Sequence, residues 1–153
     1  ITTNPHLRTM NLRREGYSRA LMEAGLMNNH TLYGEVGYKN YEKNVFDVLD
    51  HIFDRVPEVD GFFFTTHILA LEAFRYFHAH GIDTSRCGMA LIHGVAMFDV
   101  LAPNMNIAWM PIEEIGRNCV RILLEEIKNR NEPADRKVEK EAIELPCSLE
   151  FSN

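Results

Sequence analysis

The chain has 153 residues, of which 46% are apolar and 25% charged, and it carries 22 acidic against 16 basic residues for a net charge of −6. This length and composition are typical of one soluble globular domain and too small for two large ones. The acidic balance argues against a DNA-binding surface, which needs clustered lysine and arginine, and no apolar run is long enough to span a bilayer.

The N-terminal residues and the cysteines bear on the cellular compartment of the protein. The N-terminal residues lack the basic and apolar segments of a signal peptide and lack an initiator methionine, so we expect a fragment of a longer protein. The three cysteines are odd in number and form no C-x-x-C pair. Free or buried thiols in a reducing cytoplasm are therefore expected.

The first predicted elements are a helix, a short strand and a second helix. Residues 9–25 are predicted to form a helix that Thr9 caps and Gly25 ends in a left-handed conformation. A strand is expected over 32–36. Residues 40–53 are predicted to be helical because their apolar residues recur at three- and four-residue spacing.

Two nearly continuous apolar runs follow, at 59–64 and 87–92. Each is typical of a strand that is covered on both faces, as in a parallel sheet. Between them, residues 68–80 are predicted to form a helix that Gly81 closes. Strands and helices that alternate in this order predict an α/β fold with a parallel sheet flanked by helices.

The C-terminal third is predicted to differ from this alternation. Residues 103–110 are expected to be extended or irregular, and a helix opens at Pro111 and runs to about residue 130. A polar loop over 129–137 and a final strand over about 138–145 follow. The apolar stripe of the helix is predicted to be buried and comprises Ile112, Ile115, Cys119, Ile122, Leu123 and Ile127.

Several segments resemble, in the same order, segments of the lactose-repressor family of transcription regulators. The first matches are residues 13–17 (RREGY) with an R-x-x-G-aromatic element, 65–73 (TTHILALEA) with a strand end and an Ala- and Leu-rich helix, and 91–94 (LIHG) with Gly-Tyr-Asp-Asp. Later matches are residues 101–108 with a Pro-Leu-Thr-Thr segment, 110–116 (MPIEEIG) with Gln-Pro-x-x-x-x-Gly, and 122–127 (ILLEEI) with Leu-Leu-x-x-Ile. The order and spacing of the matches carry the resemblance.

This resemblance implies an incomplete two-lobe domain of the periplasmic-binding-protein-like type I fold. The second lobe would comprise mainly residues 7–103 and 138–153, whereas the strand and helix over 106–130 would belong to the first lobe. The DNA-binding head and most of the first lobe would lie outside this sequence. We predict that the helix over 111–130 packs its apolar stripe against a second copy, or swaps into a partner chain.

The resemblance also places a ligand-binding cleft at the carboxyl ends of the strands. Arg13 matches a family arginine that projects into the cleft, and its planar fork suits vicinal hydroxyls or a carboxylate. The alternative is a solvated helix arginine that only forms an ion pair with Glu15 or another neighbour. Thr66 stands where the family usually has an asparagine ligand, and the alternative is an N-cap for the following helix.

Two histidines complete the candidate ligand-binding set. His93 replaces the first aspartate of the family's paired acids, so it can hydrogen-bond a hydroxyl but cannot offer two carboxylate oxygens. The alternative is a loop histidine without a role. His67 takes the place of a family aspartate and either lines the cleft or faces solvent. His78 and His80 do not form a metal pair, because residues two apart on a helix point to different faces.

These expectations favour the effector-sensing module of a cytoplasmic regulator that forms a homodimer. Its effector would be a small carbohydrate, and its DNA would be bound by a separate helix-turn-helix head; we expect no enzyme activity, cofactor, metal or membrane partner. One alternative is a sugar-binding protein of a transport or chemoreceptor system. Another is an α/β enzyme, for which Thr66 and His93 would be a weak catalytic pair. A helix-turn-helix encoded upstream of Ile1 would favour the regulator, and a signal peptide the transport protein.

Overall fold

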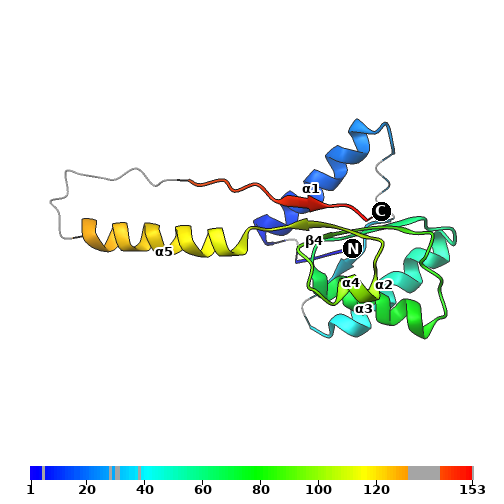
Figure 1. Ribbon diagram of the computed structural model, residues 1–153. Helices are drawn as coiled ribbons and strands as arrows, with labels where there is room; N and C mark the ends of the chain where they lie inside the picture. The colour runs from blue at the N-terminus through cyan, green and yellow to red at the C-terminus, as the bar shows by residue number, and fades with distance from the viewer. Residues whose placement is uncertain (5, 28, 30–31, 38, 131–141, 153) are drawn as a thin grey trace. The chain divides into compact units, whose positions relative to one another are not determined.

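The computed structural model describes residues 1–4, 6–27, 29, 32–37, 39–130 and 142–152 (Figure 1). The chain divides into two compact units, Ile1–Ala108 with Leu149–Asn153, and Trp109–Ser148. None of the helices in the described residues combines the length and apolarity that a membrane crossing requires.

The first unit is built on parallel strands. β1 (Thr2–Thr3) pairs with β2 (Glu35–Val36), and a second group runs in the order β3 (Gly61–Phe64), β4 (Gly88–Ile92), β5 (Met105–Trp109) and β6 (Ser148–Glu150). The pairs β1–β2, β3–β4 and β4–β5 are parallel. The α/β fold class that the sequence predicts is confirmed.

Backbone hydrogen bonds join the two groups of strands into one sheet. The Ile1 nitrogen donates to the Phe63 carbonyl at 2.5 Å, and the Thr65 N–H donates to the Ile1 carbonyl at 3.1 Å. In a parallel pair of strands, one residue bonds to the two residues that flank its partner on the neighbouring strand, and Ile1 follows this pattern. On the other side, the Thr2 N–H donates to the Gly34 carbonyl at 2.8 Å. β1 therefore lies between β2 and β3.

Helices cover the two faces of this sheet unequally. They are α1 (Arg8–Glu23), α2 (Tyr41–Arg55), α3 (His67–Ala79) and α4 (Phe98–Leu101). In Figure 1, α2, α3 and α4 lie below the strands and α1 lies above them. The alternation along β3 agrees: the Phe62 ring lies 5.0 Å from that of Phe77 on α3, whereas the Phe63 ring stacks at 5.3 Å on Tyr17 of α1.

The core lies between the sheet and the helices α2 and α3. Its buried side chains on α2 and α3 are Val45, Leu49, Ile52, Leu69, Ala70, Ala73, Tyr76 and Phe77, and those on the strands include Phe62, Phe64, Met89, Leu91, Met105 and Ile107. The Tyr76 hydroxyl donates to the Asp50 carboxylate at 2.6 Å and so ties α3 to α2. Apolar burial on this face is the main source of stability in the unit.

The second unit holds α5 (Ile112–Asn129), with Pro111 at the N-cap position. No residue of α5 is buried, and the exposed fractions are 51% for Ile112, 55% for Leu123 and 49% for Ile127. The prediction of a buried stripe on this helix is therefore wrong for the chain by itself. The reason is that the described part of this unit offers no other helix and no sheet as a packing partner.

Other differences from the sequence-based predictions lie at the ends of elements. α1 begins at Arg8 after Leu7 and has no side-chain cap, so Thr9 is not the cap, whereas Gly25 does end the helix with φ 69°. Gly81 closes α3 with φ 63°, as predicted. The predicted short strand over 32–36 is confirmed only at its last two residues.

The predicted C-terminal elements are only partly within the described residues. The polar loop over 129–137 lies outside them from residue 131 onward. Of the predicted strand, residues 138–141 also lie outside, and residues 142–145 form no strand, so the final strand is β6 instead. All three cysteines are free thiols; Cys87 is half-buried, and Cys119 and Cys147 are exposed.

Candidate ligand-binding site

The carboxyl ends of three neighbouring strands carry polar side chains. Thr3 ends β1 and Asn4 follows it, Thr65 and Thr66 follow β3, and His93 follows β4. Parallel strands end at the same edge of their sheet, which is where ligands bind in open α/β folds. The candidate site is therefore this edge of the first unit.

Arg13 reaches this edge from α1. Its Nη1 donates a hydrogen bond to the Thr65 carbonyl at 2.5 Å, one residue past the end of β3. Its side chain is half-buried, which argues against the alternative of a fully solvated arginine. Thr65 is 1% exposed, and its hydroxyl lies 3.2 Å from the Thr2 hydroxyl. The residue whose carbonyl accepts the Arg13 hydrogen bond is therefore also bonded to β1.

Thr66 occupies the N-cap position of α3 but does not act as a side-chain cap. Its backbone is extended, with φ −148° and ψ 153°, and its hydroxyl makes no capping bond within the described residues. The next residue, His67, is half-buried and opens the helix. The hydroxyl of Thr66 is thus at the edge without serving the helix, which favours the ligand-binding interpretation over the cap.

His93 follows β4 much as Thr66 follows β3. The β3–β4 register ends at the pair Phe64 and Leu91, and Thr66 and His93 each stand two residues beyond it. The His93 N–H donates to the Ala108 carbonyl at 2.9 Å, which holds its backbone against β5. The sequence-predicted residues Thr66 and His93 therefore lie at the same edge of the sheet, where Arg13 bonds to the Thr65 carbonyl.

The backbone of His93 adopts a left-handed conformation, with φ 60°. Such a conformation costs a residue with a side chain on the order of 1–2 kcal/mol, and residues of this kind cluster at functional sites. The side chain is half-buried. The observation favours a role for His93 over the alternative of a loop histidine without one.

Asn4 is a member of the edge that the sequence analysis missed. It is 7% exposed, has φ 44°, and its Oδ1 accepts a hydrogen bond from the His6 N–H at 3.3 Å. Thr2 and Thr3 beside it are also buried, and the Thr3 hydroxyl donates to the Val36 carbonyl at 2.6 Å. The only signal in the sequence is a run of small polar residues before Pro5, which is also typical of a loop.

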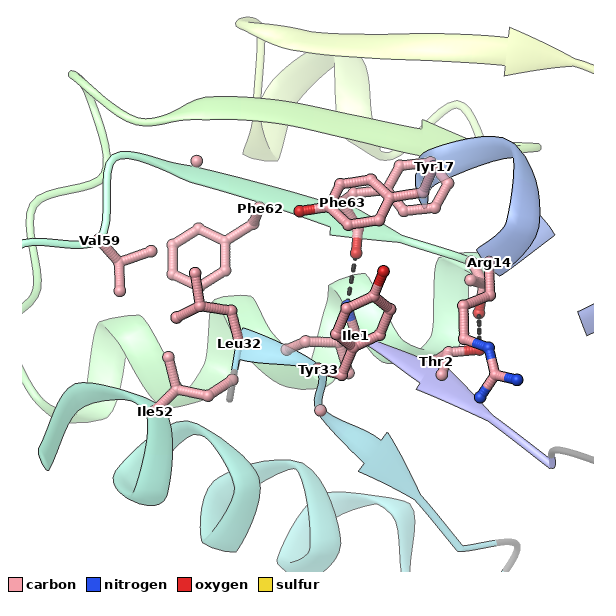
Figure 2. A pocket seen from close by; sticks show the side chains of 13 residues that line it. Ile1, Thr2, Arg14, Tyr17, Leu32, Tyr33, Ile52, Val59, Phe62 and Phe63 are labelled. Carbon is pink, nitrogen blue, oxygen red and sulfur yellow. Dashed lines mark hydrogen bonds between the residues drawn. The ribbon is translucent and has the colours of Figure 1, made fainter. Parts of the chain in front are cut away.

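A cavity of about 80 Å³ is lined by side chains of α1, α2, β3 and the segments before β2 and β3 (Figure 2). The residues that line it include Arg14, Tyr17, Leu32, Tyr33, Ile52, Val59, Phe62 and Phe63. Burial raises the pKa of the Tyr17 hydroxyl, and the Ser18 and Tyr33 hydroxyls lie 2.7 Å apart. Ligand pockets usually measure about 300–1,000 Å³. This mostly apolar cavity is small for a sugar, and we assign the ligand to the polar edge.

Metal ligation has no support in the described residues, because no group of three or more His, Cys, Asp or Glu side chains gathers there. His78 on α3 and His80 at the C-cap of α3 are both exposed, and the Nδ1 atom of His80 lies 2.9 Å from the Tyr76 carbonyl. The chemistry that the edge offers is hydrogen bonding to a polar ligand.

Comparisons with known proteins extend this description. A family model of the periplasmic binding protein-like domain matches residues 1–145. The transcriptional regulator CelR in its cellobiose complex has a TM-score of 0.73 at 22% identity, over 86% of this chain and 40% of that protein. A comparison with curated proteins finds no match.

Two further solved structures have the same fold. A regulatory protein of the LacI family from Chloroflexus aggregans has a TM-score of 0.68 at 22% identity, over 88% of this chain and 48% of its own. A PurR-family transcriptional regulator from Vibrio parahaemolyticus has a TM-score of 0.71 at 14% identity, over 98% of this chain and 52% of its own. The chain thus spans about half the length of these regulators. The predicted resemblance to the lactose-repressor family is confirmed at the level of the fold.

Proposed function

Because the chain belongs to the family of periplasmic binding protein-like domains, we propose that it is part of the effector-sensing domain of a LacI-type transcription regulator. The effector is a small sugar-like molecule, and it binds in a cleft whose one wall is the edge described above. Residues 7–103 and 138–153 are the main part of the second lobe, and the strand and helix over 106–130 belong to the first.

One observation carries this proposal: Thr66 and His93 each stand two residues beyond the last paired residues of the neighbouring parallel strands β3 and β4, and Arg13 bonds to the residue next to Thr66. Side chains from α1, β3 and β4 then face one ligand from separate elements. Such convergence of polar groups on a rigid scaffold is what recognition of a small polar molecule needs. His67, at the start of α3, is within the same group.

The proposed regulator binds DNA through a helix-turn-helix head outside this sequence. The net charge of −6 supports this separation, because phosphate binding needs clustered basic residues. Effector binding changes DNA affinity only if the ligand prefers one of two lobe arrangements, and an edge that forms one wall of a cleft provides such a preference.

The regulator is further proposed to be a cytoplasmic homodimer. The exposed apolar side chains of α5 support a partner surface of some kind, since exposed contiguous apolar groups mark interaction sites. A second copy, or the remainder of the first lobe, would bury them.

Calorimetry on the 153-residue chain with a panel of mono- and disaccharides tests the proposed site. We expect weak, millimolar binding, because one wall of a cleft supplies only part of the contacts. Arg13→Gln should weaken the best ligand about tenfold, the effect of losing a hydrogen bond from a charged donor. Arg19→Gln, which changes an exposed arginine of the same helix, is the matched control and should leave affinity unchanged. Equal affinities for the two variants would contradict the site.

A further inference from the structure

We propose that the cavity of Figure 2 is a slot for an extended chain segment, directly upstream of Ile1, that continues β1 by two residues. The segment pairs with β2 on one side and with β3 on the other. The inference rests on the proposed function, which gives the regulator a longer chain than these 153 residues. Its tests use no sugar, so it can fail while the ligand-binding proposal stands.

The cavity lies where a longer β1 would run. Backbone bonds place β1 between β2 and β3. The cavity is lined by Ile1 itself, by Gly34 directly ahead of β2, and by Gly61 and Phe63 of β3. A space in line with a strand, between the two strands that flank it, fits the next residues of that strand.

Backbone groups on both flanking strands point toward this line. The Phe63 carbonyl accepts a hydrogen bond from the Ile1 nitrogen, and the Gly34 carbonyl accepts one from the Thr2 N–H. In an extended chain the N–H of a residue points to the same side as its carbonyl, so the N–H groups of Phe63 and Gly34 also face the line of β1.

The parallel pattern assigns a partner to each of these groups. The first upstream residue would accept from the Gly34 N–H, and the second would accept from the Phe63 N–H. The second would also donate to the carbonyl of Gly61, two residues before Phe63 on the same side of β3. The segment thus extends the existing ladder without a change of register.

Side chains on the two faces of the sheet predict the type of each upstream residue. The Ile1 Cγ1 and the Ile52 Cδ1 on α2 lie 3.4 and 3.5 Å from the point where a Cβ on Gly34 would be, so Ile1 faces α2. Because side chains alternate along a strand, the second upstream residue also faces α2 and the first faces α1. Ile52 and Val59 line the cavity on one side, and Tyr17 of α1 lines it on the other (Figure 2). The second residue is therefore apolar.

The environment of the Ile1 amine agrees with a position inside a strand. Its nitrogen donates to the Phe63 carbonyl at 2.5 Å. Burial lowers the pKa of this amine to about 5, because the charged form loses its contact with water. A peptide N–H makes the same bond and carries no charge that burial would penalise.

Stability measurements on extended chains test the inference. The 153-residue chain is compared with chains that carry Val-Thr, Asp-Thr or Gly-Gly ahead of Ile1. Val-Thr directs its valine toward Ile52 and Val59, and it should lower the equilibrium constant for unfolding about tenfold relative to Gly-Gly, which corresponds to about 1.4 kcal/mol. Asp-Thr, the matched control, directs a carboxylate to the same apolar place and should give no gain over Gly-Gly. Urea denaturation measures each constant, and equal constants for Val-Thr and Asp-Thr would overturn the proposal.

Hydrogen exchange of single amides tests the register. In the Val-Thr chain, the amide protons of Gly34 and Phe63 should exchange about tenfold more slowly than in the 153-residue chain. The rates are taken relative to the Gly81 amide, which already donates to the His78 carbonyl at the end of α3. Unchanged relative rates at Gly34 and Phe63 would show that the segment does not pair there, and would overturn the proposal even if stability rises.

The pH dependence of stability supplies a third measurement. The folded state holds the Ile1 amine at a pKa of about 5 and the unfolded state at about 8, so the unfolded chain binds this proton more tightly. The 153-residue chain should therefore gain stability as pH rises from about 5 to about 8. Arg14, Tyr17 and Tyr33 also line the cavity, and side chains of these types ordinarily titrate above this range.

In the Val-Thr chain the same nitrogen is an amide and does not titrate. The stability advantage of the Val-Thr chain over the 153-residue chain should therefore be largest near pH 5 and shrink toward pH 8. The histidines and carboxylates are common to both chains, so their contributions cancel in this difference. An advantage that stays constant with pH would overturn the proposed place of the amine inside the strand.

Discussion

Helices α2 and α5 have similar amphipathic patterns and opposite surroundings. On α2, the apolar stripe is buried, with exposed fractions of 0% for Val45 and Leu49. On α5, the stripe is exposed, with fractions of 55% for Leu123 and 49% for Ile127. The pattern determines that each segment is helical, but burial depends on whether another element covers the stripe.

The first prediction is that the same substitution has very different effects on the two helices. Leu49→Ala should lower the free energy of unfolding by about 2–5 kcal/mol, because it leaves a cavity under α2. Leu123→Ala should lower it by less than about 0.5 kcal/mol, as exposed substitutions do. Urea denaturation measures both. Similar losses would mean that the stripe of α5 is covered in solution.

Two glycines, one at the end of α3 and one inside α5, allow a second test. Gly81 ends α3 with φ 63°, so Gly81→Ala should lower the free energy of unfolding by about 1–2 kcal/mol. Gly116 lies inside α5, where an added Cβ meets no atom within 4 Å. Gly116→Ala should therefore stabilise that helix by about 0.5–1 kcal/mol. The variant should then retain more helicity than the wild type when both are heated. If both substitutions stabilise the protein, or both destabilise it, the predicted contrast between the two glycines is contradicted.

A third prediction concerns the polar tie between α2 and α3. Tyr76→Phe removes the bond of 2.6 Å to Asp50 and should lower the free energy of unfolding by about 0.5–1.5 kcal/mol. Burial, and then the bond to Asp50, raise the pKa of the Tyr76 hydroxyl. The folded state therefore binds this proton more tightly than the unfolded state. The resulting stability is present below about pH 10 and is lost as pH rises further.

Denaturation of the wild type and Tyr76→Phe across alkaline pH tests this sign. Above about pH 10, the wild type should lose stability faster than the variant, so the difference between them should shrink. A difference that stays constant across this range would show that the hydroxyl titrates equally in both states.

The smallest effect is expected on the exposed face of α5. Arg121 and Glu125 form an ion pair at 3.1 Å, and both side chains are largely exposed. Arg121→Gln should lower helix stability by about 0.2–0.5 kcal/mol, and added salt should remove the difference. Circular dichroism at low and high salt measures it, and a larger, salt-independent loss would indicate that this face has a partner.

Sequence reasoning predicted best the elements that have a clear apolar pattern. Helices α2 and α3 and strands β3 and β4 begin and end within two residues of the expected positions, because an apolar period identifies the helices and a continuous apolar run identifies the strands. β1 and α4 are 2 and 4 residues long and have neither an apolar period nor a continuous apolar run of the kind that identifies β3. β6 was expected earlier in the chain, since the apolar residues near 143–145 resemble a strand but form none.

The candidate site was predictable to a similar extent. Thr66 and His93 stand at the ends of apolar runs, so the parallel topology alone predicts that they share an edge. Arg13 came from the resemblance, and its contact with the Thr65 carbonyl could not be read from spacing. Asn4 was missed because it follows a strand that no pattern reveals.

The most direct test of the account is to map where a ligand binds. Amide spectra of the isotope-labelled chain would be recorded during titration with the tightest ligand of the sugar panel. The account predicts that the largest shifts fall on Thr66, His67 and His93. Shifts that gather on Leu32 and Val59 around the cavity, with the strand ends unchanged, would contradict it.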